Sequence, residues 1–312
     1  MNPPIYINSL LEDNREACFL VLVLTLSLIA VLILTSNTAA SGDFLVDTVS
    51  SDIIGDVSTY TIKDNETLIE LARTYDVGYN EITAANKKVD PWVPERETKI
   101  ILPTSWILPY VSDNEIIINL AEMRLYYFFS IDEIKYVTTY PLGIGRQGFT
   151  TPEGSFKITA RVKDPVWTVP ENIMQEIPEL PPIVPPGPEN PLGKYWIQIS
   201  VNGYGIHGTN RPYGIGRKVS HGCIRLYPED IERLYRTTHV GTPVRIINEP
   251  VKTGKHKNRV YIEVHRSEMN ESELLNIAFE KLGEKRLLPY VDTSLIMNEI
   301  KHATGLPAII SK

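Results

Sequence analysis

Between residues 113 and 248 the chain alternates short hydrophobic segments with turn residues, and this pattern restricts the fold more than any other feature of the sequence. Within this range, a helix is predicted only at residues 228–237. Closely spaced short strands of this kind are typical of a sandwich or a barrel-like sheet. We therefore predict a mainly β domain over residues 113–248, with strands at 115–120, 125–129, 134–140, 154–160, 195–200, 205–208 and 244–247.

A separate pattern occupies residues 58–104. Tyr60 to Ile62 predicts a strand, Glu66-Thr67 opens one helix, and a second helix ends near Asn86. Lys99 to Leu102 predicts a closing strand. The order strand, helix, helix, strand predicts a small α+β module. The preceding residues, 43–57, are predicted to be a short polar linker.

The first 42 residues contain a hydrophobic segment, because residues 17–42 carry no formal charge and Phe19 to Leu34 are almost wholly aliphatic. Such a segment predicts an N-terminal hydrophobic helix that is either a membrane anchor or the core of a cleaved signal peptide. The preceding Glu12, Asp13 and Glu16 favour a retained anchor, because a secretory leader begins with basic residues. Both alternatives place residues 43–312 outside the cytoplasm, with the cytoplasmic membrane as a partner of the anchor.

Residues 249–312 predict a C-terminal extension with a hairpin and amphipathic helices at 272–282 and 294–302. The basic run Lys252 to Arg259 is predicted to be a solvated hairpin loop. The net charge is −7, and no long basic block offsets it. Nucleic acid is therefore not an expected partner, because phosphate binding needs a concentrated basic surface.

The segment Pro178 to Pro191 has proline at half of its positions. Proline fixes the backbone angle φ and removes a hydrogen-bond donor, so this segment is predicted to be a stiff, irregular loop. A long loop inside a compact domain is often a lid or a binding wall. We predict a lid, with a plain surface connection as the alternative.

The chain has two cysteines, Cys18 in the hydrophobic segment and Cys223 in the β-rich domain. Exported proteins usually pair their cysteines or avoid them. A single cysteine outside the membrane segment therefore suggests nucleophilic catalysis, although a small buried apolar residue is an equal alternative on composition.

Two short blocks contain residues that could act together with this cysteine. They are His207-Gly208 and Ser220-His221-Gly222-Cys223-Ile224-Arg225. A thiol attacks a carbonyl as the thiolate, and a nearby imidazole can accept its proton. Glycines beside the reactive groups allow close backbone approach, and amides near Gly222 and Cys223 can form an oxyanion hole. The alternatives are a zinc site using His207, His221 and Cys223, which lacks a second cysteine, and a purely structural role.

These blocks resemble the signature of the L,D-transpeptidase catalytic domain of the YkuD type. The resemblance implies that Cys223 is the nucleophile and His207 the proton donor and acceptor. It also implies that Gly208 orients the imidazole and that Ser220, His221 and Gly222 shape the nucleophile loop. Some relatives carry Asn in place of Arg225, so no fixed role follows for that residue. The further residues that carry the resemblance are Ile118 to Tyr126, Tyr140 to Gly145, Thr151 to Gly154 and Pro185 to Gly193.

Residues 58–104 resemble a LysM module, and the resemblance departs from the common form at Asp64-Asn65-Glu66. It implies binding to the glycan of peptidoglycan, whereas a small packing module without a ligand is the alternative. The residues that carry it are Tyr60 to Ile62, Glu66 to Ile69, Leu71-Ala72, Asn86 and Ile100 to Pro103.

Together the two resemblances suggest the branch that attaches Braun's lipoprotein to peptidoglycan. They imply a thioester at Cys223 formed from a tetrapeptide stem, and an acceptor amine on another stem or on an outer-membrane lipoprotein. No metal or organic cofactor is implied. The alternatives are a hydrolase, in which water resolves the thioester, and a peptidoglycan-binding anchor with an inert catalytic domain. The acceptor and the oligomeric state do not follow from the sequence.

Overall fold

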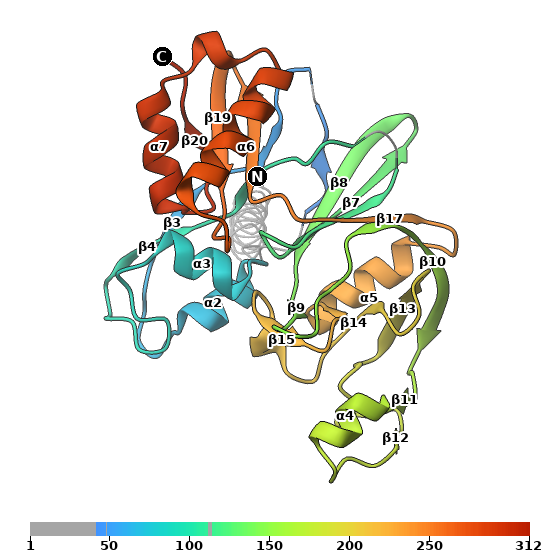
Figure 1. Cartoon of the computed structure of the whole chain (residues 1–312). Coiled ribbons are helices and arrows are strands. Elements are labelled where there is room, and N and C mark those ends of the chain that lie inside the picture. Colours follow the sequence, from blue (N-terminus) through green and yellow to red (C-terminus); the bar gives the residue numbers. More distant parts are fainter. Residues whose placement is uncertain (1–41, 48, 112–113) are drawn as a thin grey trace, which may run out of the picture. The chain divides into compact units, whose positions relative to one another are not determined.

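The computed structural model describes residues 42–47, 49–111 and 114–312 (Figure 1). The hydrophobic segment predicted as an anchor or signal lies outside the described residues. Within the described part of the chain, no helix is both long and apolar enough to cross a membrane.

A nine-stranded mixed sheet forms the centre of the β-rich region. Each pair of neighbouring strands is antiparallel except for β6 with β17 and β14 with β16, which are parallel. The mainly β architecture predicted from the sequence is confirmed, and each of the seven predicted strands is present. The strands in spatial order are β1 (Phe44–Leu45), β8 (Ile134–Pro141), β7 (Arg124–Ile131), β6 (Ile116–Asn119), β17 (Pro243–Ile247), β10 (Gly154–Lys163), β13 (Tyr195–Ile199), β14 (Gly205–His207) and β16 (Ile224–Arg225).

Strand β6 and the first five residues of β7 are buried on both faces of the sheet. Successive side chains of a strand point to opposite sides, so neighbouring residues enter different cores. Ile116 and Leu125 enter a core that is shared with helix α5 (Pro228–Thr237). Ile117 and Tyr126 enter a second core, which contains the apolar residues of the strand–helix–helix–strand segment. The sheet that carries the candidate site is therefore covered on one side by α5 and on the other by the N-terminal module.

The N-terminal segment has the predicted order: β3 (Ser58–Thr61), α2 (Leu68–Thr74), α3 (Tyr79–Ala85) and β4 (Lys99–Leu102). β3 pairs with β4, and Thr67 caps α2 in a reciprocal capping box with Glu70. The module is fixed to the sheet by a buried ion pair, in which Arg124 of β7 donates to Glu81 of α3 at 2.8 Å.

The prediction of a linker at residues 43–57 was wrong. Phe44 pairs with Val137 as part of β1, and β2 (Ile53–Gly55) pairs with β5 (Ser105–Ile107). These strands are short and depend on partners that are distant in the sequence, so local alternation does not identify them.

The C-terminal segment forms a three-stranded sheet and two helices around its own hydrophobic core. The prediction of a solvated loop at Lys252 to Arg259 is wrong for Lys252, which is only 2% exposed, whereas Lys257 lies at the exposed hairpin tip. The elements are β18 (Val251–His256), β19 (Arg259–Val264), β20 (Ala308–Ile309), α6 (Glu271–Glu284), the 3-10 turn η2 (Leu288–Tyr290) and α7 (Thr293–His302).

An excursion of the chain connects β10 to β13 and includes the proline-rich segment. The Asp164 amide donates to the Lys194 carbonyl at its base, at 2.7 Å. The excursion holds α4 (Glu171–Glu176), a helix that the sequence did not predict, between β11 (Trp167–Thr168) and β12 (Ile183–Val184) (Figure 1). The remaining elements near the candidate site are β9 (Ile144–Gly145), η1 (Pro212–Gly214) and β15 (Lys218–Ser220).

Candidate active site

His207 ends strand β14, and Cys223 directly precedes the neighbouring strand β16 at one edge of the nine-stranded sheet. β14 pairs in parallel with β16, so that Ile206 lies opposite Ile224 and His207 lies opposite Arg225. Cys223 directly precedes β16 and reaches the level of Gly205. With the usual strand spacing and rise, the Cα atoms of His207 and Cys223 are roughly 8 Å apart on the diagonal.

Because side chains alternate along a strand, these two strands have one face toward the hydrophobic core and one face toward the candidate site. Ile206 and Ile224 point into the hydrophobic core. The opposite face carries His207 and Arg225, and the same alternation places the Cys223 side chain there. The charge of Arg225 influences the pKa of both His207 and Cys223, which is consistent with a shared face.

The imidazole of His207 is held in one orientation from two sides. Its Nδ1 lies 2.6 Å from the Gly208 carbonyl oxygen, so Nδ1 carries the proton and donates, and the lone pair is on Nε2. The Trp196 ring stacks on the imidazole with centroids 5.6 Å apart. Burial, and then the charge of Arg225, lower the pKa of His207 to about 3. His207 is therefore neutral, the form that can accept a proton.

Cys223 is partly exposed, and its Sγ donates to the Gly203 carbonyl at 3.5 Å. Burial raises the pKa of the thiol, while a backbone hydrogen bond from Gly205 and the charge of Arg225 oppose the rise. The resting pair is therefore a neutral thiol beside a neutral imidazole. Gly205 leaves room here, because a Cβ at this position would lie 2.6 Å from the Trp196 ring.

The turn that delivers Cys223 is held by two hydroxyl groups. The Ser220 Oγ accepts from the Gly222 amide at 3.1 Å and donates to the Cys223 carbonyl. The Thr151 Oγ1 donates to the Gly222 carbonyl at 2.8 Å. Gly222 has φ +106°, a value that L-residues rarely adopt, and a Cβ there would meet the Tyr204 ring at 2.6 Å.

This geometry changes one expectation from the sequence. The Gly222 amide was a candidate donor to an oxyanion, but it already donates within the turn to Ser220. Thr151 was visible in the sequence only as part of a motif, and its bond to Gly222 identifies it as a support of the turn before Cys223.

Arg225 contributes a partly buried positive charge beside this pair. Its Nε is buried and has no hydrogen-bond partner among the residues that the structure describes. Burial lowers the pKa of Arg225, and Cys223 raises it. This charge disfavours an imidazolium at His207 and favours a thiolate at Cys223, because like charges repel and opposite charges attract.

His221 points to a different group of side chains, which the sequence did not reveal. Its Nε2 lies 3.0 Å from the Glu176 carboxylate of α4 and 3.0 Å from an Nη of Arg146. Arg146 also donates to the same Glu176 oxygen. Glu176 is 45 residues away in the sequence and lies in the irregular excursion, so no local pattern connects it with His221.

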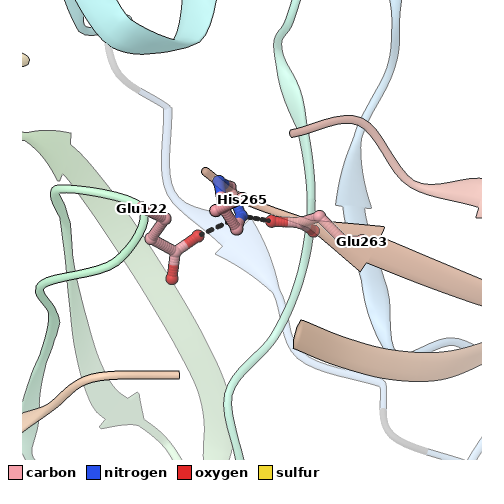
Figure 2. A group of neighbouring side chains, drawn as sticks. All are labelled: Glu122, Glu263 and His265. Carbon is pink, nitrogen blue, oxygen red and sulfur yellow. Dashed lines mark hydrogen bonds and ion pairs between the residues drawn. The ribbon is translucent and has the colours of Figure 1, made fainter. Parts of the chain in front are cut away.

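Within the described residues, one group of possible metal ligands lies away from Cys223. Glu122, Glu263 and His265 converge there, and Figure 2 shows the His265 imidazole between the two carboxylates. The Lys252 ammonium lies among them, 2.6 Å from Glu122 and 2.8 Å from Glu263. Burial alone would lower the pKa of Lys252, but the two carboxylates raise it. A side-chain cation therefore already supplies the positive charge that a metal would bring.

Known proteins resemble the chain over its β-rich domain and beyond. Residues 113–246 match the family model YkuD, described as the L,D-transpeptidase catalytic domain. The chain is 35% identical over 286 residues to the probable L,D-transpeptidase YbiS of Escherichia coli K12, which covers 87% of this chain and 92% of that protein. It is 35% identical over 281 residues to the probable L,D-transpeptidase ErfK/SrfK of Salmonella typhimurium, covering 84% and 88%.

Among solved structures, the NMR structure of the catalytic domain of the Enterococcus faecium L,D-transpeptidase is 22% identical and covers 45% of this chain and 100% of that chain, with a TM-score of 0.35. The extent of the match to the enterobacterial proteins defines the class of the molecule. The chain belongs to the L,D-transpeptidase family, and it is an enzyme of that class.

Proposed function

We propose that the enzyme transfers acyl groups between peptide stems of peptidoglycan through a thioester at Cys223, with His207 as proton acceptor and donor. The observation that carries this proposal is the parallel register of β14 and β16, which brings His207 and Cys223 to one face. The bond from Nδ1 to the Gly208 carbonyl supports it, because it leaves Nε2 free to accept the thiol proton.

In the first half-reaction, sulfur attacks the carbonyl carbon of the third residue of a tetrapeptide stem. The thiol proton passes to Nε2 of His207 as the C–S bond forms. The C–N bond then breaks, and the imidazolium gives its proton to the departing amine of D-alanine. We assign the developing oxyanion to the Cys223 amide, since the Gly222 amide is used within the turn.

The proton transfer accompanies the attack and does not precede it. A separate thiolate–imidazolium pair is unfavourable in the resting site, because burial lowers the pKa of His207 and raises the pKa of Cys223. Removal of water by a bound peptide strengthens the attraction of Arg225 for a developing thiolate.

In the second half-reaction, an amine attacks the thioester carbonyl and gives its proton to Nε2 of His207. The C–S bond breaks, and the sulfur recovers a proton from the imidazolium. A diaminopimelate amine of another stem would give a 3–3 cross-link, and a terminal lysine of an outer-membrane lipoprotein would join that protein to the wall. Water in place of the amine would make the enzyme a hydrolase.

Residues 58–104 are proposed to be a LysM module that holds the enzyme on peptidoglycan glycan. The order β3, α2, α3, β4 and the capped start of α2 support this assignment. We further propose that the enzyme works in the periplasm, tethered by an N-terminal helix or released by cleavage of a signal peptide.

Intact-protein mass spectrometry tests the nucleophile. The full chain, Cys223→Ala and the exposed control Ser294→Ala are incubated with a carbapenem, which should acylate an activated thiol. We expect a covalent adduct on the wild type and on the control, and none on Cys223→Ala. A folded wild type without an adduct would remove the main support for the enzyme mechanism and favour the wall-binding anchor.

A product assay then separates the acceptors. The wild type is supplied with a disaccharide tetrapeptide donor and either a second stem or a peptide ending in lysine. A 3–3 linked dimer, a lysine-linked product and a disaccharide tripeptide identify cross-linking, lipoprotein attachment and hydrolysis respectively.

A further inference from the structure

Arg146, His221 and Glu176 form a charged group beside the nucleophile turn that the proposed reaction does not use. His221 lies two residues before Cys223 in the sequence. Arg146 follows β9 directly, and its amide donates to the Ser220 carbonyl at 2.9 Å. His221 therefore belongs to the turn that holds Cys223 and Arg146 is hydrogen-bonded to that turn, whereas Glu176 comes from α4.

His221 and Arg146 converge on a single oxygen of Glu176. Oε2 of Glu176 lies 3.0 Å from Nε2 of His221 and also accepts from Arg146. A carboxylate can only accept, so Nε2–H of His221 and Nη–H of Arg146 both donate to this oxygen. The 3.0 Å separation of these two nitrogens then follows from their shared acceptor and is not a hydrogen bond between them. The hydrogen bond from His221 lowers the pKa of Glu176, as does the charge of Arg146, while partial burial raises it.

Phe149 fixes the two donors from behind. The Arg146 guanidinium lies over the Phe149 ring at 4.6 Å from its centroid, and the His221 ring meets Phe149 edge to face at 4.7 Å. The Phe149 amide in turn donates to the Arg146 carbonyl at 2.9 Å. The donors are therefore held in place independently of Glu176.

Glu176 is the replaceable member. Its side chain is 40% exposed and that of Arg146 is 37% exposed, and exposed ion pairs contribute little to stability. Glu176 is also the last residue of a six-residue helix in the excursion, away from the nine-stranded sheet. Its departure leaves two convergent donors that match a carboxylate.

We propose that Arg146 and His221 form a binding site for a carboxylate of the donor peptide, and that Glu176 occupies this site until the donor displaces it. This inference rests on the proposed function, because it takes the donor to be a tetrapeptide stem. Such a stem carries a terminal carboxylate on its departing residue and further carboxylates on its side chains. The site then determines which peptides place their scissile carbonyl at Cys223.

Isothermal titration calorimetry of the full chain in a Cys223→Ala background tests the site without turnover. The titrant is the soluble tetrapeptide. Adding Arg146→Ala should raise Kd about tenfold, which corresponds to about 1.4 kcal/mol. Adding Glu176→Gln should lower Kd two- to threefold, because the competing carboxylate is gone. The matched controls Arg259→Ala and Glu171→Gln, both exposed and outside this group, should leave Kd unchanged.

Amidated peptides identify the carboxylate. The one whose amidation weakens binding to the Cys223→Ala protein, but not to the same protein carrying Arg146→Ala, is the carboxylate that the site holds. The two forms compared are the tetrapeptide with an amide at its C-terminus and the tetrapeptide with amidated side-chain carboxylates.

Two results would overturn the inference. One is an unchanged Kd for Arg146→Ala; the other is a higher Kd for Glu176→Gln, which would make Glu176 a contact and not a competitor. Alkylation of the single-variant proteins by iodoacetamide, an uncharged reagent, should proceed at the wild-type rate. A parallel loss of alkylation rate would instead mean that Arg146 positions the turn. Failure of the proposed function is seen separately, as a wild type that binds the tetrapeptide but forms no adduct or product.

Discussion

Two buried polar groups in this molecule are built in opposite ways. Around Lys252, the polar atoms are matched with partners: the ammonium contacts Glu122, Glu263, the Ile107 carbonyl and the Tyr126 hydroxyl. Around His207, a neutral imidazole is buried beside Arg225, whose Nε has no hydrogen-bond partner in the described part of the chain. The Lys252 group joins three parts of the chain. The group around His207 keeps polar atoms that a substrate could still contact.

The difference suggests that one group stabilises the fold and that the other serves the reaction. Breaking a matched buried group leaves an uncompensated charge, which is costly to the folded state. Changing an unmatched group removes little from the folded state but alters the protonation and charge offered to the reaction. The predictions below test this division from the largest expected effect to the smallest.

Replacing His207 by Gln should have the largest effect, and the effect should be on rate. General acid–base catalysis contributes about 10²- to 10⁴-fold, so acylation of Cys223 should slow by about that factor. The free energy of unfolding should change far less, because Gln can still donate to the Gly208 carbonyl. Acylation kinetics by mass spectrometry and urea unfolding measure the two quantities. A variant that loses stability and keeps its rate would reverse the assignment.

Replacing Lys252 by Met should show the opposite behaviour. The variant leaves Glu122 and Glu263 buried without their cation, and the loss of one partner of a buried pair costs about 3–5 kcal/mol. Lys255→Met on the same strand is the control, since an exposed substitution should stay within about 0.5 kcal/mol of the wild type. Urea unfolding measures both variants, and equal stability of the two would show that the buried group is not held by charge.

The pH dependence of the free energy of unfolding should report the protonation of His207. The pKa of His207 is about 3 in the folded protein and about 6.5 when unfolded, so its contribution is complete above pH 6.5 and declines as the pH falls toward 3. Between pH 7 and pH 5 the wild type should lose about 2 kcal/mol more than His207→Gln. Parallel curves for the two proteins would mean that His207 becomes protonated in the folded state.

The exposed pair Arg73–Glu229 should give the smallest effect. It joins α2 to the start of α5 at 2.8 Å, but its side chains are 43% and 50% exposed. Arg73→Ala should therefore destabilise the protein by less than about 1 kcal/mol. Urea unfolding in low and high salt measures this contribution. A loss comparable to that of Lys252→Met would show that exposure does not control the strength of these ion pairs.

Sequence patterns predicted the sheet well because its strands are buried in regular alternation. Ile116 to Ile118 and Leu125 to Phe128 have the composition and length of buried strands, so local information sufficed. The short strand β1 was not predicted, because Phe44 becomes a strand residue only through its pairing with Val137. Helix α4 was missed because it lies beside a segment dominated by proline.

The candidate site was predictable as far as its members lie close together in the sequence. His207 and Cys223 stand in two recognisable blocks, and the register of β14 with β16 places them together. Arg146 and Glu176 were not found, because their partner His221 is brought to them only by the tertiary fold. Lys252 was misplaced for the same reason: its partner Glu122 is 130 residues away.

The contact of Cys223 with the Gly203 carbonyl also affects how readily the sulfur is oxidised when no substrate is bound. A carbonyl oxygen can accept only from the protonated thiol, so this contact at 3.5 Å stabilises the S–H form. Peroxide and disulfides react with the thiolate, and a cysteine that remains protonated is oxidised slowly. Under the proposed mechanism, the sulfur therefore resists oxidation to sulfenic acid while no substrate is bound, and it becomes reactive toward oxidants when the reaction removes its proton.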